Sequence, residues 1–174
     1  CFFSKAIMAW TMLIELRNAA NTIRARWESD RSVVVPRLLS RGKYHTFLSH
    51  NWASAQDQAR SIKELLTSLV PGLRVWLDVD DMRGKAGTSA TNTANFEFVI
   101  DCAESMICIL AGEFREDGPV SSYFRSGGCL KEIRRAIQTS TPIIFVLELD
   151  PTHHGVPMAA HLRDAPNDLQ PVLQ

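Results

Sequence analysis

Glu132 lies where a single carboxylate could contact a bound ligand. It belongs to the segment Ser121–Ile133, which follows an apolar run and carries a helix-opening pattern. We therefore expect Glu132 in the first turns of a helix, at the carboxyl edge of a parallel sheet. Ligands bind at that edge in open α/β sheets, and a carboxylate there can stabilise positive charge on a ligand. The simpler interpretation is an ordinary glutamate favoured by the helix dipole and paired with Arg135.

Other standard chemistries find little support in the sequence. It contains no G-x-x-x-x-G-K-[ST] loop, no G-x-G-x-x-G fingerprint and no G-x-S-x-G elbow. His153 and His154 would bind a metal only if further ligands converged, and a solvated loop pair is the simpler interpretation. Asp78, Asp80 and Asp81 could hold Mg²⁺, but they more simply end a strand and cap a loop. We therefore expect no metal at the site.

Apolar strands and amphipathic helices alternate from Tyr44 onward. Strands are predicted at 46–49, 73–79, 106–110 and 142–147, and helices around 54–69, 96–103 and 130–137. Loops are predicted where polar residues and glycine gather, at 80–93 and from 111 to 128. This βαβαβαβ order predicts a parallel sheet with right-handed crossovers and helices on both faces.

Four finer expectations concern a helix cap, the burial of two strands and the C-terminal segment. Ser54 and Asp57 form a plausible capping box for the first helix. The strand at 73–79 alternates, which is typical of a position near the sheet edge. The strand at 142–147 is continuously apolar, which predicts burial on both faces. Residues 151–174 hold four of the eight prolines and show no helical pattern, so a ragged or truncated end is expected.

Residues 1–42 differ from the rest and are expected to form an N-terminal helix and a linker. The run 6–14 is apolar on nearly all sides, but it is shorter than the roughly 20 residues that span a bilayer. It is expected to pack on the domain or on upstream sequence. The alternative is the end of a membrane helix, because several arginines follow it. The chain starts at Cys1 rather than Met, so we expect a piece of a longer protein.

Composition narrows the class of partner and the compartment. Lys plus Arg equals Asp plus Glu at 19 each, which argues against a nucleic-acid binder that relies on bulk charge. The four cysteines form no C-x-x-C pair and no metal spacing. Buried reduced thiols and a cytoplasmic location are therefore expected, with membrane attachment only through sequence N-terminal to this chain.

Five segments resemble, in order and spacing, the motifs of TIR (Toll/interleukin-1 receptor/resistance protein) domains: Tyr44–His50, Val75–Met82, Glu104–Leu110, Tyr123–Ile133 and Thr141–Val146. The similarity is clearest over 44–150, within a domain expected to run from 43 to 174. The resemblance implies a flavodoxin-like open parallel sheet of strand order 2-1-3-4, with room for a fifth strand. It also implies intracellular signalling, association with other TIR domains and, in many members, cleavage of NAD⁺ at the nicotinamide–ribose bond.

The resemblance assigns the catalytic glutamate of the family to Glu132. As nicotinamide leaves, the ribose gains oxocarbenium character, which a nearby carboxylate can stabilise. The other residues expected to line the site are His50, Asn51, Trp52, Asp78, Arg125 and Cys129. Two positions depart from the family pattern: Asn51 replaces a frequent Arg, and Gly128 replaces a frequent Trp. Trp52 could supply stacking and Arg125 could supply charge in their place.

The leading hypothesis is a self-associating NAD⁺ glycohydrolase that needs no cofactor and takes NAD⁺ as its substrate. The alternative is a non-catalytic adaptor that binds other TIR domains through the loop at 80–93, which corresponds to the family's BB loop. A third hypothesis is a flavodoxin-like domain that binds a small molecule and is unrelated to TIR domains. The chemistry of Glu132 separates the first hypothesis from the second.

Overall fold

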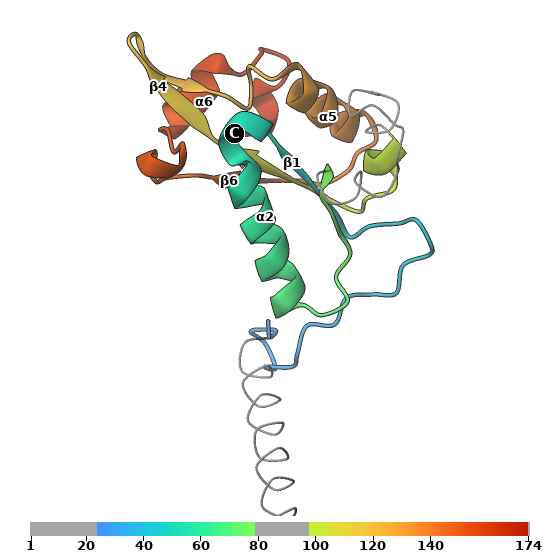
Figure 1. Ribbon diagram of the computed structural model, residues 1–174. Helices are drawn as coiled ribbons and strands as arrows, with labels where there is room; N and C mark the ends of the chain where they lie inside the picture. Colours follow the sequence, from blue (N-terminus) through green and yellow to red (C-terminus); the bar gives the residue numbers. More distant parts are fainter. Residues whose placement is uncertain (1–23, 79–97, 174) are drawn as a thin grey trace, which may run out of the picture.

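The computed structural model describes residues 24–78 and 98–173, which contain a parallel sheet with helices on both faces (Figure 1). The sheet has four strands in the order β2-β1-β3-β6: β2 (Val75–Trp76), β1 (Thr46–His50), β3 (Met106–Leu110) and β6 (Ile143–Leu147). All three pairings are parallel. The predicted α/β, flavodoxin-like fold and the order 2-1-3-4 are thereby confirmed.

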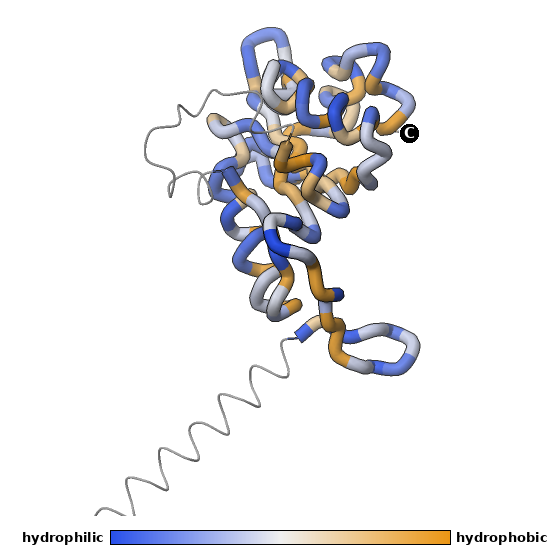
Figure 2. Tube along the Cα trace, turned by 90° about the vertical axis from the view of Figure 1, so that its right-hand side faces the viewer, coloured by the Kyte–Doolittle hydropathy of each residue, from blue (hydrophilic) through white to orange (hydrophobic). Residues whose placement is uncertain are grey.

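The two central strands, β1 and β3, lie in the core of the domain. All five residues of β1 and all five of β3 are buried. The register pairs Phe47 with Met106 and His50 with Ile109, so both strands end at the same edge. In Figure 2 many of the hydrophobic stretches of the chain lie at the centre of the domain.

Each face of the sheet is covered by a different helix. The helix α2 (Trp52–Leu69) places Ala55 and Ala59 on one face, against Leu48 of β1. The helix α5 (Gly127–Gln138) places Ile133 on the other face. Side chains alternate along a strand, so successive residues at the end of β1 reach opposite faces.

The helix α2 begins differently from the prediction. Asn51 is its N-cap, and the Asn51 Oδ1 accepts a hydrogen bond from the backbone N–H of Ala53 at 3.0 Å. The prediction of a capping box at Ser54 is wrong, because the Ser54 hydroxyl donates to Asn51 Oδ1 instead of accepting a hydrogen bond from a backbone N–H. Ala55 has non-helical angles and marks a kink. The helix therefore starts directly after β1, which brings Asn51 and Trp52 to the sheet edge.

A β-hairpin occupies part of the segment predicted as a long loop. Its strands β4 (Gly112–Arg115) and β5 (Gly118–Ser121) pair antiparallel. Gly118 has φ +114° at the turn, and a Cβ on Gly112 would lie 2.2 Å from the Val120 carbonyl oxygen. Both positions therefore favour glycine, the first for its angle and the second for space. The prediction of an irregular segment from 111 to 128 is wrong.

The C-terminal segment is more regular than predicted. It contains the 3₁₀ turn η1 (Pro151–His153), the helix α6 (Met158–Asp164) and the 3₁₀ turn η2 (Gln170–Leu173). Ala165 and Leu169 join the core on the α5 face. The prediction that this region lacks a helix is wrong, and the segment completes the side of the domain that carries α5.

The strand β6 is half-exposed, although its apolar run predicts burial on both faces. Ile144 is 52% exposed and Val146 is 36% exposed, whereas Phe145 packs into the core on the α5 face. The reason is its place at the edge of the described sheet, where α2 covers β1 and β3 but not β6.

Several predictions at the margins lie outside the described residues. These are the apolar helix at 6–14, the loop at 80–93 and the start of the helix at 96–103, of which 98–101 are described as helical. The division of the chain at residue 42 stays a prediction. Among residues 24–78 and 98–173, no helix is both long and apolar enough to cross a bilayer.

Candidate functional site

The candidate site lies where the chain leaves β1 and β3 at the carboxyl edge of the sheet. From β1 the chain passes through α2 to β2 on one side, while β3 lies on the other side of β1. This is the point at which the strand order reverses, and open α/β sheets bind ligands there. His50 ends β1, Asp78 follows β2, and Glu132 lies in the second turn of α5.

Glu132 is turned towards this edge. The Ser49 hydroxyl donates to Glu132 Oε2 at 2.6 Å, and Ser49 Oγ lies 2.7 Å from the Tyr123 hydroxyl oxygen. Arg135, the alternative partner, instead donates to Asp101 at 2.8 and 2.6 Å. The side chain is therefore partly buried at the sheet edge rather than ion-paired along the outer helix face.

The surroundings of Glu132 disfavour its charged form. Burial raises the pKa of Glu132 from 4.5 to about 7, and the negative charge of Asp78 adds to that effect. The hydrogen bond from Ser49 acts in the opposite direction and favours the carboxylate. Protonated and ionised forms therefore coexist near neutral pH, and a bound cation would shift the group towards the carboxylate.

His50, Asp78 and Trp52 meet at the same edge. His50 Nε2 lies 4.0 Å from Asp78 Oδ1 and 3.2 Å from Gln56 Oε1. The Trp52 indole N–H donates a hydrogen bond to Asp78 Oδ2. His50 and Asp78 are buried, while the Trp52 side chain is 50% exposed. The indole is thus held in place with much of its ring open to solvent, as a stacking surface requires.

Asn51, Arg125 and Cys129 have other partners. Asn51 caps α2, and its Nδ2 donates to the Ser122 carbonyl at 3.2 Å. Arg125 Nε donates to Asp164 Oδ2 at 3.1 Å. Burial raises the pKa of Cys129 to about 12, with the charge of Glu132 acting in the same direction, so the thiol stays protonated. Asn51 and Cys129 therefore lie next to the site while supporting the fold, and Arg125 is engaged with α6.

The segment that leads into α5 is anchored by α6. The backbone N–H of Ser121 donates to Asp164 Oδ2 at 2.9 Å. His161 Nδ1 lies 2.7 Å from Ser121 Oγ, and both side chains are buried. These contacts fix the chain just before the helix that carries Glu132.

The start of α5 beside Glu132 carries little side-chain bulk among the described residues. Ser126 caps α5, and its side chain accepts a hydrogen bond from the Cys129 backbone N–H at 3.4 Å. A Cβ on Gly128 would meet only Ser126 Oγ, at 3.7 Å. Residues four apart share one face of a helix, so position 128 lies beside Glu132. Gly128 leaves that face without a side chain.

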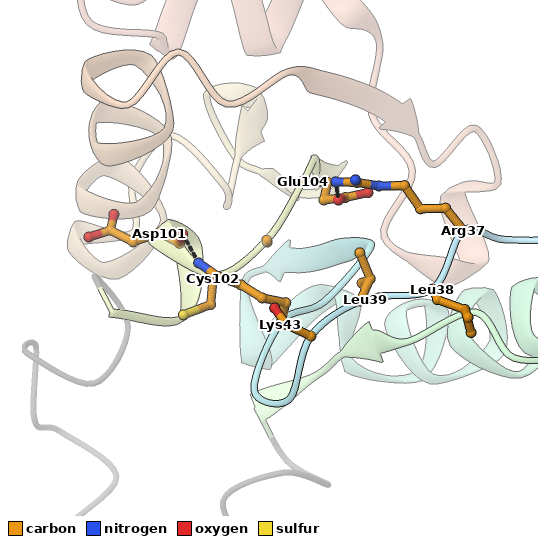
Figure 3. Close-up of a pocket in the computed structure, with 9 residues that line it drawn as sticks. Arg37, Leu38, Leu39, Lys43, Asp101, Cys102 and Glu104 are labelled. Carbon is orange, nitrogen blue, oxygen red and sulfur yellow. Dashed lines mark hydrogen bonds and ion pairs between the residues drawn. The ribbon is translucent and has the colours of Figure 1, made fainter.

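A separate pocket of about 310 Å³ lies at the amino ends of the strands, between the segment before β1 and the segment before β3 (Figure 3). Both of its basic side chains have partners within the chain. Arg37 pairs with Glu104, and Lys43 Nζ donates to the Asp101 carbonyl at 3.2 Å. This pocket is remote from the edge that carries Glu132.

Comparison with known proteins identifies the fold. No family model and no curated protein matches the sequence. A solved structure of a metazoan TIR-STING receptor from C. gigas matches 80% of this chain and 39% of that chain, with a TM-score of 0.52 and 18% identity. The same receptor in complex with 2',3'-cGAMP matches 79% of this chain and 36% of that chain, with a TM-score of 0.51 and 19% identity. The chain has a TIR-like fold. It spans less than two-fifths of the length of the receptor chains that it matches.

Within this TIR-like fold, sequence reasoning missed two residues that contact or support Glu132. Ser49 directly follows the apolar residues Phe47 and Leu48 in β1. Because side chains alternate along the strand, Ser49 faces α5 while His50 faces α2. Tyr123 is fully buried, and a buried phenol needs a hydrogen-bond partner. A polar group at the end of an apolar strand was the only available signal for Ser49. No signal indicated that Tyr123 would meet it.

Proposed function

We propose that this TIR-like domain is a self-associating signalling module that cleaves the nicotinamide–ribose bond of NAD⁺, with Glu132 as its catalytic residue. The observation that supports this proposal is the position of Glu132. Its carboxyl group lies at the point where the strand order reverses, anchored by Ser49 on one oxygen. Its pKa of about 7 is typical of a group adapted to chemistry near neutral pH.

The reaction needs a negative charge beside the ribose. The bond between C1 of the ribose and the nicotinamide nitrogen breaks, and its electron pair neutralises the departing ring. The ribose then carries oxocarbenium character, which the Glu132 carboxylate stabilises. Water adds to C1 and releases a proton, giving ADP-ribose and nicotinamide.

Neighbouring side chains supply supporting interactions in this proposal. Asp78 adds a second negative charge near Glu132, which favours a cationic ligand. The half-exposed indole of Trp52 provides a face for stacking against an aromatic ring. Because NAD⁺ carries its positive charge on the nicotinamide, that ring is the part of the substrate best matched to this acidic edge.

A non-catalytic adaptor is the second candidate, and two observations favour it. Arg125, which could have held the dinucleotide phosphates, is ion-paired with Asp164. Gly128 offers no aromatic side chain beside Glu132. In this role the domain would bind other TIR domains through the loop at 80–93, which lies outside the described residues.

The decisive experiment measures nicotinamide release from NAD⁺ by the purified chain. Glu132→Ala is expected to abolish release while the thermal melt remains cooperative. Glu64→Ala is the matched control, because Glu64 is an exposed glutamate on α2, and it should retain full activity. Absence of release by the wild-type chain at every concentration would favour the adaptor.

Self-association is tested in the same assay. If neighbouring copies complete the active state, specific activity should rise with protein concentration over a hundredfold range. Flat specific activity, together with a monomeric mass across that range, would contradict this part of the proposal.

A further inference from the structure

The hydroxyl groups behind Glu132 form a directed chain. Ser49 Oγ lies 2.6 Å from Glu132 Oε2 and 2.7 Å from the Tyr123 hydroxyl oxygen. A serine hydroxyl has one proton, and Ser49 donates it to the carboxylate. The Tyr123 hydroxyl must therefore donate to Ser49 when Glu132 is ionised. Burial keeps the Tyr123 phenol protonated by raising its pKa well above the usual value, so its proton stays available to Ser49.

The members of this chain come from separate parts of the fold and are buried. Ser49 lies on β1 and Tyr123 in the segment between β5 and α5, and both are almost fully inaccessible to solvent. Hydrogen bonds in such surroundings strengthen one another and hold their donors in one geometry. Among the described residues, Glu132 Oε2 has this partner, whereas no hydrogen bond to Oε1 occurs.

We infer that Ser49 and Tyr123 are positioning residues, which orient the Glu132 carboxylate through a buried hydrogen-bond relay and leave its second oxygen for the ligand. Ser49 acts directly on Glu132, and Tyr123 acts through Ser49. The relay also favours the ionised form, since a donor to a carboxylate stabilises the charge. For the catalytic consequence this inference rests on the proposed function, but the orientation itself does not.

A purely structural role would look different. Tyr123, Ser49 and Glu132 could serve only as hydrogen-bond partners for one another. Removing a hydroxyl would then change the stability of the fold and leave the pKa of Glu132 unchanged. The relay instead predicts that removing a distant hydroxyl changes the protonation of Glu132. Thr46 provides a matched control, because its hydroxyl is also buried on β1 but has no hydrogen-bond partner among the described residues.

The test is an NMR titration of the side-chain carboxyl carbon of Glu132, assigned with Glu132→Gln. Ser49→Ala is expected to raise the pKa of Glu132 above the wild-type value by about one pH unit, the equivalent of one lost hydrogen bond to a charged group. Tyr123→Phe should raise it by less. Ser49→Thr, which keeps the hydroxyl, and Thr46→Val should both titrate like the wild type.

The outcomes are separable. Unchanged titration in both Ser49→Ala and Tyr123→Phe would overturn the relay. If Ser49→Ala does not fold, Tyr123→Phe alone decides, since it keeps the packed ring and removes only the hydroxyl. In the nicotinamide-release assay, the acidic limb of the pH profile should move to higher pH in the same order as the titrations. A shifted titration in a chain that never releases nicotinamide would uphold the relay and reject the proposed function.

Discussion

Replacing Glu132 with glutamine should stabilise the domain at alkaline pH. The structure holds the pKa of Glu132 at about 7, against 4.5 in a solvated glutamate. Between these values the folded chain keeps a proton that the unfolded chain has lost, so wild-type stability falls as the pH rises through this window. Glutamine is neutral throughout and resembles the protonated side chain, so Glu132→Gln removes that loss.

The size of the effect follows from the same two values. Each tenfold change in proton affinity corresponds to about 1.4 kcal/mol, so the difference between 4.5 and about 7 corresponds to about 3 kcal/mol. The variant and the wild type should therefore be closely similar near about pH 4, and the variant should be more stable by about 3 kcal/mol at about pH 8.5. Such a gain would accompany loss of activity, a trade often found at functional sites.

Denaturant unfolding of both proteins at a series of pH values measures the difference directly. Titrations of groups that do not interact with Glu132 cancel in the comparison, which leaves the contribution of Glu132 and of its coupling to Asp78 and Cys129. Glu64→Gln, at an exposed position on α2, is the control and should show no pH-dependent gain. The reasoning is refuted if Glu132→Gln is no more stable than the wild type at alkaline pH, because Glu132 would then ionise as easily in the folded chain as in the unfolded one.

Three further predictions address the reaction, the open helix face and the buried histidine. Only the carboxylate form of Glu132 is active, so kcat/KM for nicotinamide release should fall about tenfold per pH unit as the pH drops below the pKa of Glu132, about 7. A fall that begins only near pH 4.5 would contradict this. Gly128→Trp should fold, because φ at this position lies outside the left-handed region and a Cβ has room. Stacking of the indole on the substrate should then lower KM about threefold to tenfold. An unchanged KM with an unchanged melting temperature would show that position 128 does not face the substrate. Burial lowers the pKa of His161 from 6.5 to about 4, so the wild type should lose up to about 3 kcal/mol as the pH falls through that window, and His161→Gln should lack this component in acid unfolding curves. Equal acid sensitivity of the two proteins would show that His161 is readily protonated in the folded state.

The central strands could be predicted from the sequence because their apolar composition indicates burial. The run at 106–110 is apolar throughout, as a strand covered on both faces must be, and the strand at 46–49 precedes polar residues that mark its end. The edge position of the strand after α2 also followed from its alternation, although only Val75–Trp76 pair in the described sheet.

The hairpin could not be predicted because its sequence looks like a surface loop. Glu113, Arg115, Glu116 and Asp117 interrupt any apolar alternation. Val120 is buried through its packing in the folded domain, and the hairpin depends on close backbone contact at Gly112. Tertiary contacts of this kind override local pattern, as they also do for the short helix α6 behind Pro157.

The candidate site was predicted in outline rather than in detail. Glu132, His50 and Asp78 meet at the expected edge because the carboxyl ends of parallel strands lie together. The contact between Ser49 and Glu132 joins residues 83 positions apart, and no local pattern encodes such a pair. The ion pair of Arg125 with Asp164 was equally invisible, because the helix that supplies Asp164 was not expected.

The anchoring of Ser121 by α6 has a consequence for the order in which the domain folds. Ser121 meets residues 40 and 43 positions further along the chain, and closing loops of that length is entropically costly and slow. A chain in which α6 has not docked lacks the contacts that hold the entry to α5, and with them the fixed position of Glu132. The edge that carries Glu132 and Asp78 is therefore completed by a segment that is synthesised after every residue of the site, so partly folded molecules would carry all of these residues without their geometry.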